Sequence, residues 1–90
     1  MLNRLEETIR DRQANAPANS YTASLFAKGP EKIAQKFGEE AIEVLIAAQS
    51  QTRERLIEET ADLMYHLSVL LVEKGVSWED VGQVLRRREN

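Results

Sequence analysis

Five acidic residues, arranged in two short groups, are the part of this 90-residue sequence that could carry chemistry. Glu39, Glu40 and Glu43 form the pattern E-E-x-x-E, and Glu59 and Asp62 form E-x-x-D. Residues three apart project from the same face of a helix, so each group would present its carboxylates together. If the two helices pack side by side, Glu40, Glu43, Glu59 and Asp62 meet at one place, where they repel each other unless a cation joins them. Such oxygen ligands suit hard cations, and Mg²⁺ is the usual choice where phosphate groups complete the coordination shell.

Lysines share the acidic face of the first of these helices. Lys32 and Lys36 lie within about 60° of the glutamates on a helical wheel, and Lys28, just before Gly29, could add to them from the preceding segment. A cation and several ammonium groups on one face would suit a polyphosphate, because together they neutralise its charge. The alternative is an ordinary solvated face, in which Lys36 and Glu40 form an i, i+4 pair. Spacing alone leaves both interpretations open.

Other polar residues have simpler explanations beside the functional ones. His66 lies on the stripe of Glu59 and Asp62, where it is either a hydrogen-bonded structural residue or a group with a substrate-binding or acid–base role. Trp78 follows a capping serine and is interpreted as a packing anchor. The run Arg86–Arg88 is typical of a solvated helix end, where cations interact favourably with the helix dipole, rather than of a phosphate clamp.

The elements that must position these residues are all helices. Pro, Gly and Asn divide the chain, and apolar residues recur at helical spacing between them. Ser20 to Lys28 could be a short helix or an ordered loop, and Ser77 with Asp80 has the spacing of a capping box. No segment shows a sustained strand alternation. The sequence therefore predicts an all-α bundle of four to five helices, the longer ones being Leu2–Ala14, Pro30–Gln49, Arg53–Lys74 and Ser77–Arg88.

Two apolar patterns indicate how the bundle packs. In the segment Pro30–Gln49, one arc of the helix should form the buried face, and it holds Ile33, Ala34, Phe37, Ala41, Val44, Leu45 and Ala48. The segment Leu63–Val72 is apolar around nearly its whole circumference, which requires cover on all sides. A second copy of the chain would supply that cover, so a homodimer is expected. The alternative is that the first and last helices of the same chain suffice.

Composition narrows the remaining possibilities. The net charge is -3, which is not the electrostatic footprint of a nucleic-acid-binding protein, and there is no cysteine for a disulfide or a thiolate metal site. The longest apolar run is far shorter than the roughly 20 residues that cross a bilayer. The N-terminus lacks the apolar core of a signal peptide. We therefore expect a single cytoplasmic domain over residues 1–90 that contacts neither nucleic acid nor membrane.

Several stretches of the sequence resemble the phosphoribosyl-ATP pyrophosphohydrolase family of histidine biosynthesis. The resemblance runs from about Leu5 to Arg88. Its acidic patterns are shared with the wider MazG-like, all-α nucleotide pyrophosphatases, whereas the S-Y-T and K-x-G-E-E-A stretches are the more specific part. The matching segments are Ser20–Thr22, Leu25–Phe26, Lys28–Gly29, Lys32–Lys36, Gly38–Ala41 with Glu43, Glu58–Glu59, Ala61–Leu63 and Tyr65–Leu67.

The resemblance implies a reaction and assigns residues to it. Phosphoribosyl-ATP and water would give phosphoribosyl-AMP and pyrophosphate, in a helical homodimer that uses Mg²⁺. The metal ligands would be Glu40, Glu43, Glu59 and Asp62, and these with Glu39 form the expected catalytic set. Substrate would be bound by Tyr21, Lys28, Lys32, Lys36 and His66. The alternatives are a MazG-like house-cleaning nucleoside triphosphate pyrophosphatase and a non-catalytic helical dimerisation module.

Overall fold

The computed structural model describes residues 1–89 and contains five helices and, within that range, no strand. In chain order the helices are α1 (Leu2–Asn15), α2 (Tyr21–Lys28), α3 (Pro30–Ser50), α4 (Arg53–Glu73) and α5 (Trp78–Arg88). The prediction of an all-α fold is confirmed. The segment that the sequence left undecided is the helix α2. None of the helices in residues 1–89 is long and apolar enough to cross a membrane.

Local sequence signals set the helix ends. The side chains of Ser20, Thr52 and Ser77 each accept a hydrogen bond from a backbone N–H in the first turn of α2, α4 and α5. The predicted capping box of α5 is present, because Asp80 also accepts a hydrogen bond from the backbone of Ser77 at 2.9 Å. The helix α4 ends where Gly75 takes a positive φ of 70°, which a residue with a side chain rarely adopts.

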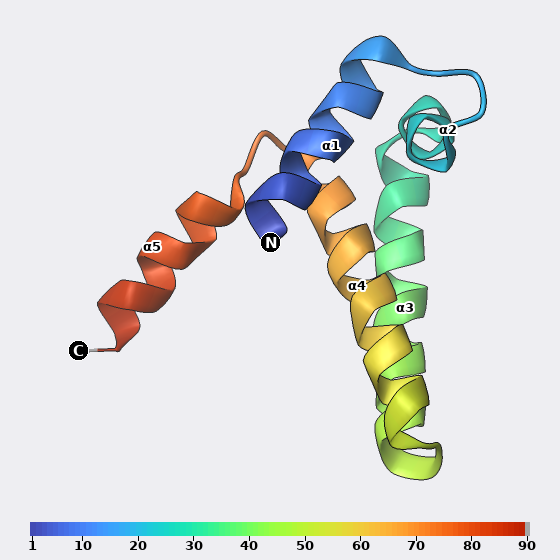
Figure 1. The fold of residues 1–90 in the computed structure, drawn as a ribbon, viewed down its shortest axis with the longest axis vertical. Coiled ribbons are helices and arrows are strands. Elements are labelled where there is room, and N and C mark those ends of the chain that lie inside the picture. The colour runs from blue at the N-terminus through green and yellow to red at the C-terminus, as the bar shows by residue number, and fades with distance from the viewer. Residues whose placement is uncertain (90) are drawn as a thin grey trace.

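The long helices α3 and α4 form an antiparallel hairpin, and α1 and α2 pack at one end of it (Figure 1). Side chains from α1, α2, α3 and α4 meet there in one core, which consists of Ile9, Leu25, Ile33, Val69 and Val72. The far half of the hairpin extends beyond this core. It carries the turn between α3 and α4 and much of the acidic sequence.

The helix α5 projects away from the hairpin and none of its residues is buried (Figure 1). Its first residue attaches it to the rest of the chain. The backbone N–H of Trp78 donates to Glu6 Oε1 on α1 at 2.7 Å, and the indole N–H donates to Ser68 Oγ on α4 at 2.8 Å. The other oxygen of Glu6 pairs with Arg10 at 2.8 Å. Trp78 is thus an anchor, as the sequence indicated.

The predicted buried face of α3 is only partly correct within one chain. Ile33 is buried, but Leu45 is 64% exposed and Ala34 and Ala48 are also exposed. The face that α3 turns toward α4 is rotated from the predicted one and includes the polar residue Glu40. The reason is that α4 presents Glu59 to α3, and the residue that meets it there is Glu40.

The apolar segment of α4 is also covered incompletely. No side chain from Leu63 to Val72 is exposed, yet several of them, including Leu67 and Leu71, remain only half-buried. The helix α1 packs against α4, whereas α5 contributes mainly its Trp78 anchor. The helices of one chain therefore bury only part of the apolar surface of α4, and apolar side chains on one side of the hairpin remain accessible to solvent.

Candidate active site

Three carboxylates from the two long helices converge in the middle of the hairpin. Glu40 and Glu43 lie on successive turns of α3, and Glu59 lies on α4. Each offers one oxygen atom, and these atoms all lie within 4.8 Å of one another. The sequence spacing explains the geometry, because residues three apart share a helix face and the antiparallel hairpin brings the two faces together.

Asp62 and Glu39 lie outside this group of three. Asp62 is exposed and lies one turn along α4 from Glu59, and it contributes no atom to the cluster. Glu39 is exposed and is bound by its own helix: it accepts a hydrogen bond from Gln35 at 2.9 Å and pairs with Lys36 at 3.4 Å. Of the four expected metal ligands, the structure brings together Glu40, Glu43 and Glu59.

The cluster has unsatisfied negative charge. Glu59 is 4% exposed and Glu40 is 9% exposed, and the Oε2 atom of each has no hydrogen-bond partner among the described residues. Buried carboxylate oxygens normally have partners, because desolvation without a hydrogen bond is costly. The neighbouring carboxyl of Glu43 and then burial raise the pKa of Glu59 above its usual value. This donor set, all oxygen and crowded, fits a hard divalent cation such as Mg²⁺.

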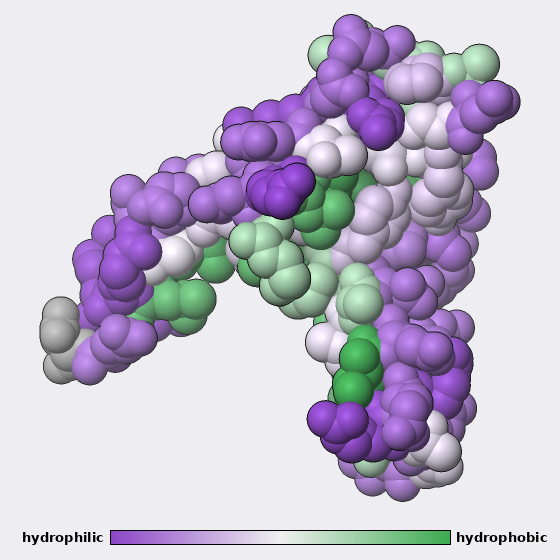
Figure 2. All heavy atoms as spheres, in the orientation of Figure 1, coloured by the Kyte–Doolittle hydropathy of each residue, from purple (hydrophilic) through white to green (hydrophobic). Residues whose placement is uncertain are grey.

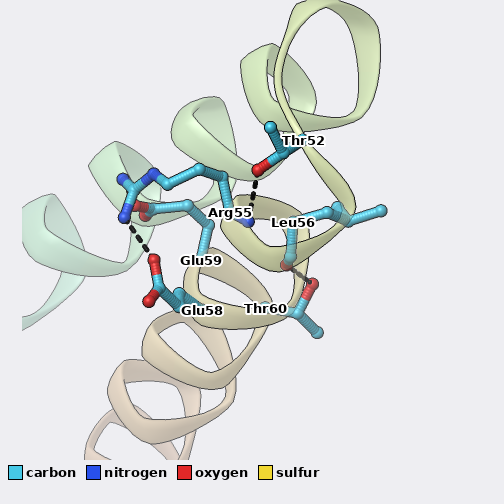
Figure 3. Close-up of polar contacts among 6 residues, drawn as sticks. All are labelled: Thr52, Arg55, Leu56, Glu58, Glu59 and Thr60. Atoms are coloured by element: carbon cyan, nitrogen blue, oxygen red, sulfur yellow. Dashed lines mark hydrogen bonds and ion pairs between the residues drawn. The ribbon is translucent and has the colours of Figure 1, made fainter.

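Arg55 is a member of the site that sequence reasoning missed (Figure 3). Its guanidinium spans two neighbouring carboxylates of α4, Glu58 at 2.6 Å and the buried Glu59. Arg55 binds Glu59 through Oε1, so the unpartnered Oε2 is left facing the cluster. Arg55 and Glu59 line a pocket at the hairpin turn together with Glu43, Ile46 and Gln51. The i, i+3 and i, i+4 spacing of Arg55 to the two glutamates was the available signal.

The three lysines occupy different positions relative to the carboxylates. Lys36 is half-buried on α3, four residues before Glu40, and the nearby Tyr21 together with Glu39 raises its pKa. Lys32 is half-buried one turn earlier on the same face, while Lys28 is exposed at the end of α2. The structure thus places Lys36 nearest to the acidic group.

Tyr21 and His66, the two other residues expected to bind substrate, contact each other across α2 and α4. The Tyr21 hydroxyl lies 3.2 Å from His66 Nε2, and His66 Nδ1 lies 2.8 Å from the backbone oxygen of Asp62. A carbonyl oxygen can only accept, so Nδ1 carries a proton, and in the neutral ring Nε2 accepts from Tyr21. His66 is therefore both hydrogen-bonded and buried, and it joins α2 to the helix that carries Glu59.

The arginines at the end of α5 lie in its last turn, and Arg86 pairs with Glu79 of the same helix at 2.8 Å. All three are exposed, and α5 projects away from the carboxylate cluster (Figure 1). This placement agrees with the interpretation of a solvated helix end. It does not bring these arginines to the site of the one described chain.

Comparison with known proteins gives one family over nearly the whole chain. The family model "Phosphoribosyl-ATP pyrophosphohydrolase" matches residues 2–89. The chain is 52% identical over 89 residues to the phosphoribosyl-ATP pyrophosphatase of Gluconobacter oxydans, covering 99% of this chain and 67% of that protein. It is 54% identical over 88 residues to the enzyme of the same name from Rhizorhabdus wittichii, covering 98% and 83%. It also matches the "Histidine biosynthesis bifunctional protein HisIE" of Vibrio cholerae, at 51% identity over 97% of this chain and 41% of that protein. By these matches the chain belongs to the phosphoribosyl-ATP pyrophosphohydrolase family.

Proposed function

We propose that this protein hydrolyses phosphoribosyl-ATP to phosphoribosyl-AMP and pyrophosphate, the second step of histidine biosynthesis. Family membership over residues 2–89 supports the substrate, and the relatives' names support the reaction. Water adds its oxygen to phosphorus, and the anhydride bond between the α- and β-phosphates breaks. The observation that carries the chemistry is the cluster of Glu40, Glu43 and Glu59 with its two buried, unpartnered oxygens.

In this proposal the carboxylates hold Mg²⁺. Glu40, Glu43 and Glu59 would bind it, and Asp62, one turn away on the same side of α4, would complete the set when the side chain turns inward. A cation held there would neutralise charge on the phosphate oxygens and polarise the anhydride. Arg55 orients Glu59 by holding its Oε1 atom. Glu39, which joins the expected catalytic set, keeps Lys36 directed along the same face.

The lysines and the aromatic residues would bind the rest of the substrate. Lys36 lies between the carboxylates and Tyr21, where an ammonium group would meet phosphate oxygens. Lys32 and Lys28 continue the positive charge toward the α2–α3 corner. Such charge-assisted contacts are worth roughly 1.5–3 kcal/mol each when formed. Tyr21, close to Lys36, contacts His66 and would meet the substrate beside the lysines.

The functional unit in this proposal is a homodimer. Within one chain Leu45 is 64% exposed and Ala48 is exposed, although both belong to the stripe that the sequence pattern marks for burial. Further apolar side chains gather on the concave side between α4 and α5 (Figure 2), where Met1, Leu2, Ile57 and Met64 line a groove. Open apolar surface of this kind is typical of an association site. A second copy of the chain would cover it. The cytoplasmic location expected from the sequence stays a prediction.

The experiment that tests the function is pyrophosphate release from phosphoribosyl-ATP, with ATP as the control substrate, in the presence and absence of Mg²⁺. The proposal requires release from phosphoribosyl-ATP that depends on Mg²⁺ and is much slower from ATP. Preference for another nucleoside triphosphate would favour the house-cleaning pyrophosphatase. No release from any nucleotide, with no effect of Glu59→Gln on metal binding, would leave the non-catalytic dimerisation module.

A further inference from the structure

Three aromatic side chains form a platform beside the carboxylate cluster. Tyr21 comes from the first turn of α2, and Tyr65 and His66 are neighbours on α4. The rings of Tyr21 and Tyr65 are stacked with centroids 6.2 Å apart, and His66 meets Tyr65 edge-on at 4.9 Å. Tyr65 also packs against the hydrophobic core, whereas Tyr21 is 49% exposed. The platform thus has a buried side that supports it and an open ring.

Hydrogen bonds fix the orientation of this open ring. The hydroxyl of Tyr21 is bound to Nε2 of His66 at 3.2 Å, and His66 is held in turn by the backbone oxygen of Asp62 at 2.8 Å. The hydroxyl groups of Thr22 and Tyr65 are bonded to each other across the same two helices. An exposed tyrosine usually samples several rotamers, but the hydroxyl of this one is bound to His66 and its ring stacks on Tyr65. A ring that is oriented in advance binds a flat ligand at a smaller entropic cost.

The platform lies at a useful distance from the cluster. His66 follows Glu59 by seven residues, which is about 10 Å along a helix axis. Lys36 stands between them on α3, four residues before Glu40 and next to Tyr21. The order along the hairpin is therefore carboxylates, an ammonium group and an aromatic ring. A nucleotide has the same order of chemistry from its metal-bound phosphates, across the ribose, to the base.

We propose that Tyr21, supported by Tyr65 and His66, is the stacking subsite for the purine base of the substrate. The inference rests on the proposed nucleotide hydrolysis and deepens it by assigning one end of the substrate to named residues. An open tyrosine ring gains dispersion and electrostatic energy from a base laid on its face. His66 is a positioning residue in this scheme, because it acts on the ligand through the Tyr21 hydroxyl.

The test compares Tyr21→Ala with Tyr21→Phe, which keeps the ring and removes the hydroxyl. For Tyr21→Ala, loss of stacking should raise KM for phosphoribosyl-ATP and weaken AMP as an inhibitor, each by about fivefold or more. Inhibition by inorganic pyrophosphate, which has no base, should change less than about twofold, because pyrophosphate would engage only the cation and the lysines. The loss for Tyr21→Phe should be clearly smaller than for Tyr21→Ala.

Three results would overturn the inference. They are an unchanged KM and AMP inhibition in Tyr21→Ala, an equal loss of AMP and pyrophosphate inhibition, or a loss in Tyr21→Phe as large as in Tyr21→Ala. The second result would mean that Tyr21 merely maintains the fold, and melting curves of both variants would register it. Calorimetric titration of the parent with AMP at saturating Mg²⁺ needs no turnover. If the parent binds AMP through Tyr21 but does not hydrolyse phosphoribosyl-ATP, the proposed function is refuted and the base subsite stands. If the enzyme is active and Tyr21→Ala binds AMP as well as the parent does, the function stands and the subsite is refuted.

Discussion

Replacing Leu45 by Ala should weaken the association of two copies while leaving the fold of each copy intact. Leu45 projects from α3 on the apolar stripe and is 64% exposed in one chain, so its packing within the chain is slight. If a partner covers that exposed part, losing three carbons there costs about 1.5 kcal/mol in each copy, at about 0.8 kcal/mol per buried CH₂. In a two-fold interface the residue acts twice, so about 3 kcal/mol is lost, or about two orders of magnitude in the dissociation constant.

Sedimentation velocity over a range of protein concentrations measures this change directly. The matched control is Leu85→Ala, which makes the same truncation at a side chain that is 56% exposed on α5, away from the α3 stripe of Leu45. Leu45→Ala should shift the monomer–dimer midpoint, and Leu85→Ala should shift it less. A parent that is monomeric and active at micromolar concentration, or equal effects of the two substitutions, would refute the reasoning that the stripe of Leu45 is the interface.

Four further outcomes follow from particular contacts. In the metal-free chain the pKa of Glu59 is higher in the folded state than its ordinary value of 4.5. Glu59 therefore contributes to the stability of the fold below pH 4.5, and this contribution is lost as the pH rises through the pKa of the folded state. Glu59→Gln should flatten that dependence in urea titrations and should also remove the rise in melting temperature on adding Mg²⁺. Glu6→Ala leaves the backbone N–H of Trp78 without its acceptor and should lower the free energy of unfolding by about 1–3 kcal/mol. The fluorescence of Trp78, the single tryptophan of the chain, follows the unfolding transition that measures this loss. Ser77→Ala should destabilise the protein by about 1 kcal/mol in thermal melts, through loss of the α5 cap. The hydrogen bond from the Ser77 backbone lowers the pKa of Asp80 below its ordinary value of 3.8. Asp80 therefore stabilises the fold above pH 3.8, and this contribution is lost as the pH falls through the lower pKa of the folded state. Asp80→Asn should remove this acid dependence.

The sequence predicted the helices well because their signals are local. Apolar spacing located them, and Ser77 with Asp80 predicted a cap that forms within four residues. The convergence of Glu40, Glu43 and Glu59 was also foreseeable, since i, i+3 pairs on adjacent helices have few ways to face each other.

The rest depended on how the helices are rotated about their axes. Pattern alone assigned Leu45 to the buried face of α3, but the face that meets α4 is set by the partner helix, which carries Glu59 and His66. The same uncertainty hid the role of Arg55, whose spacing to Glu59 is also that of an ordinary surface pair. It also left the position of Asp62 open, because one turn along a helix does not fix where a carboxylate points.

A single residue, Gly29, joins the helix that carries Tyr21 to the helix that carries Lys36, Glu40 and Glu43. Its φ of 97° is a conformation that residues with a side chain rarely adopt, although a Cβ there would meet no atom within 4 Å. The demand for glycine is therefore conformational rather than steric. So short a connection gives the two helices little freedom to slide apart. If base and cation bind at the two ends, the separation between them is set by the backbone, and nucleotides with a shorter or longer phosphate chain could satisfy only one end at a time.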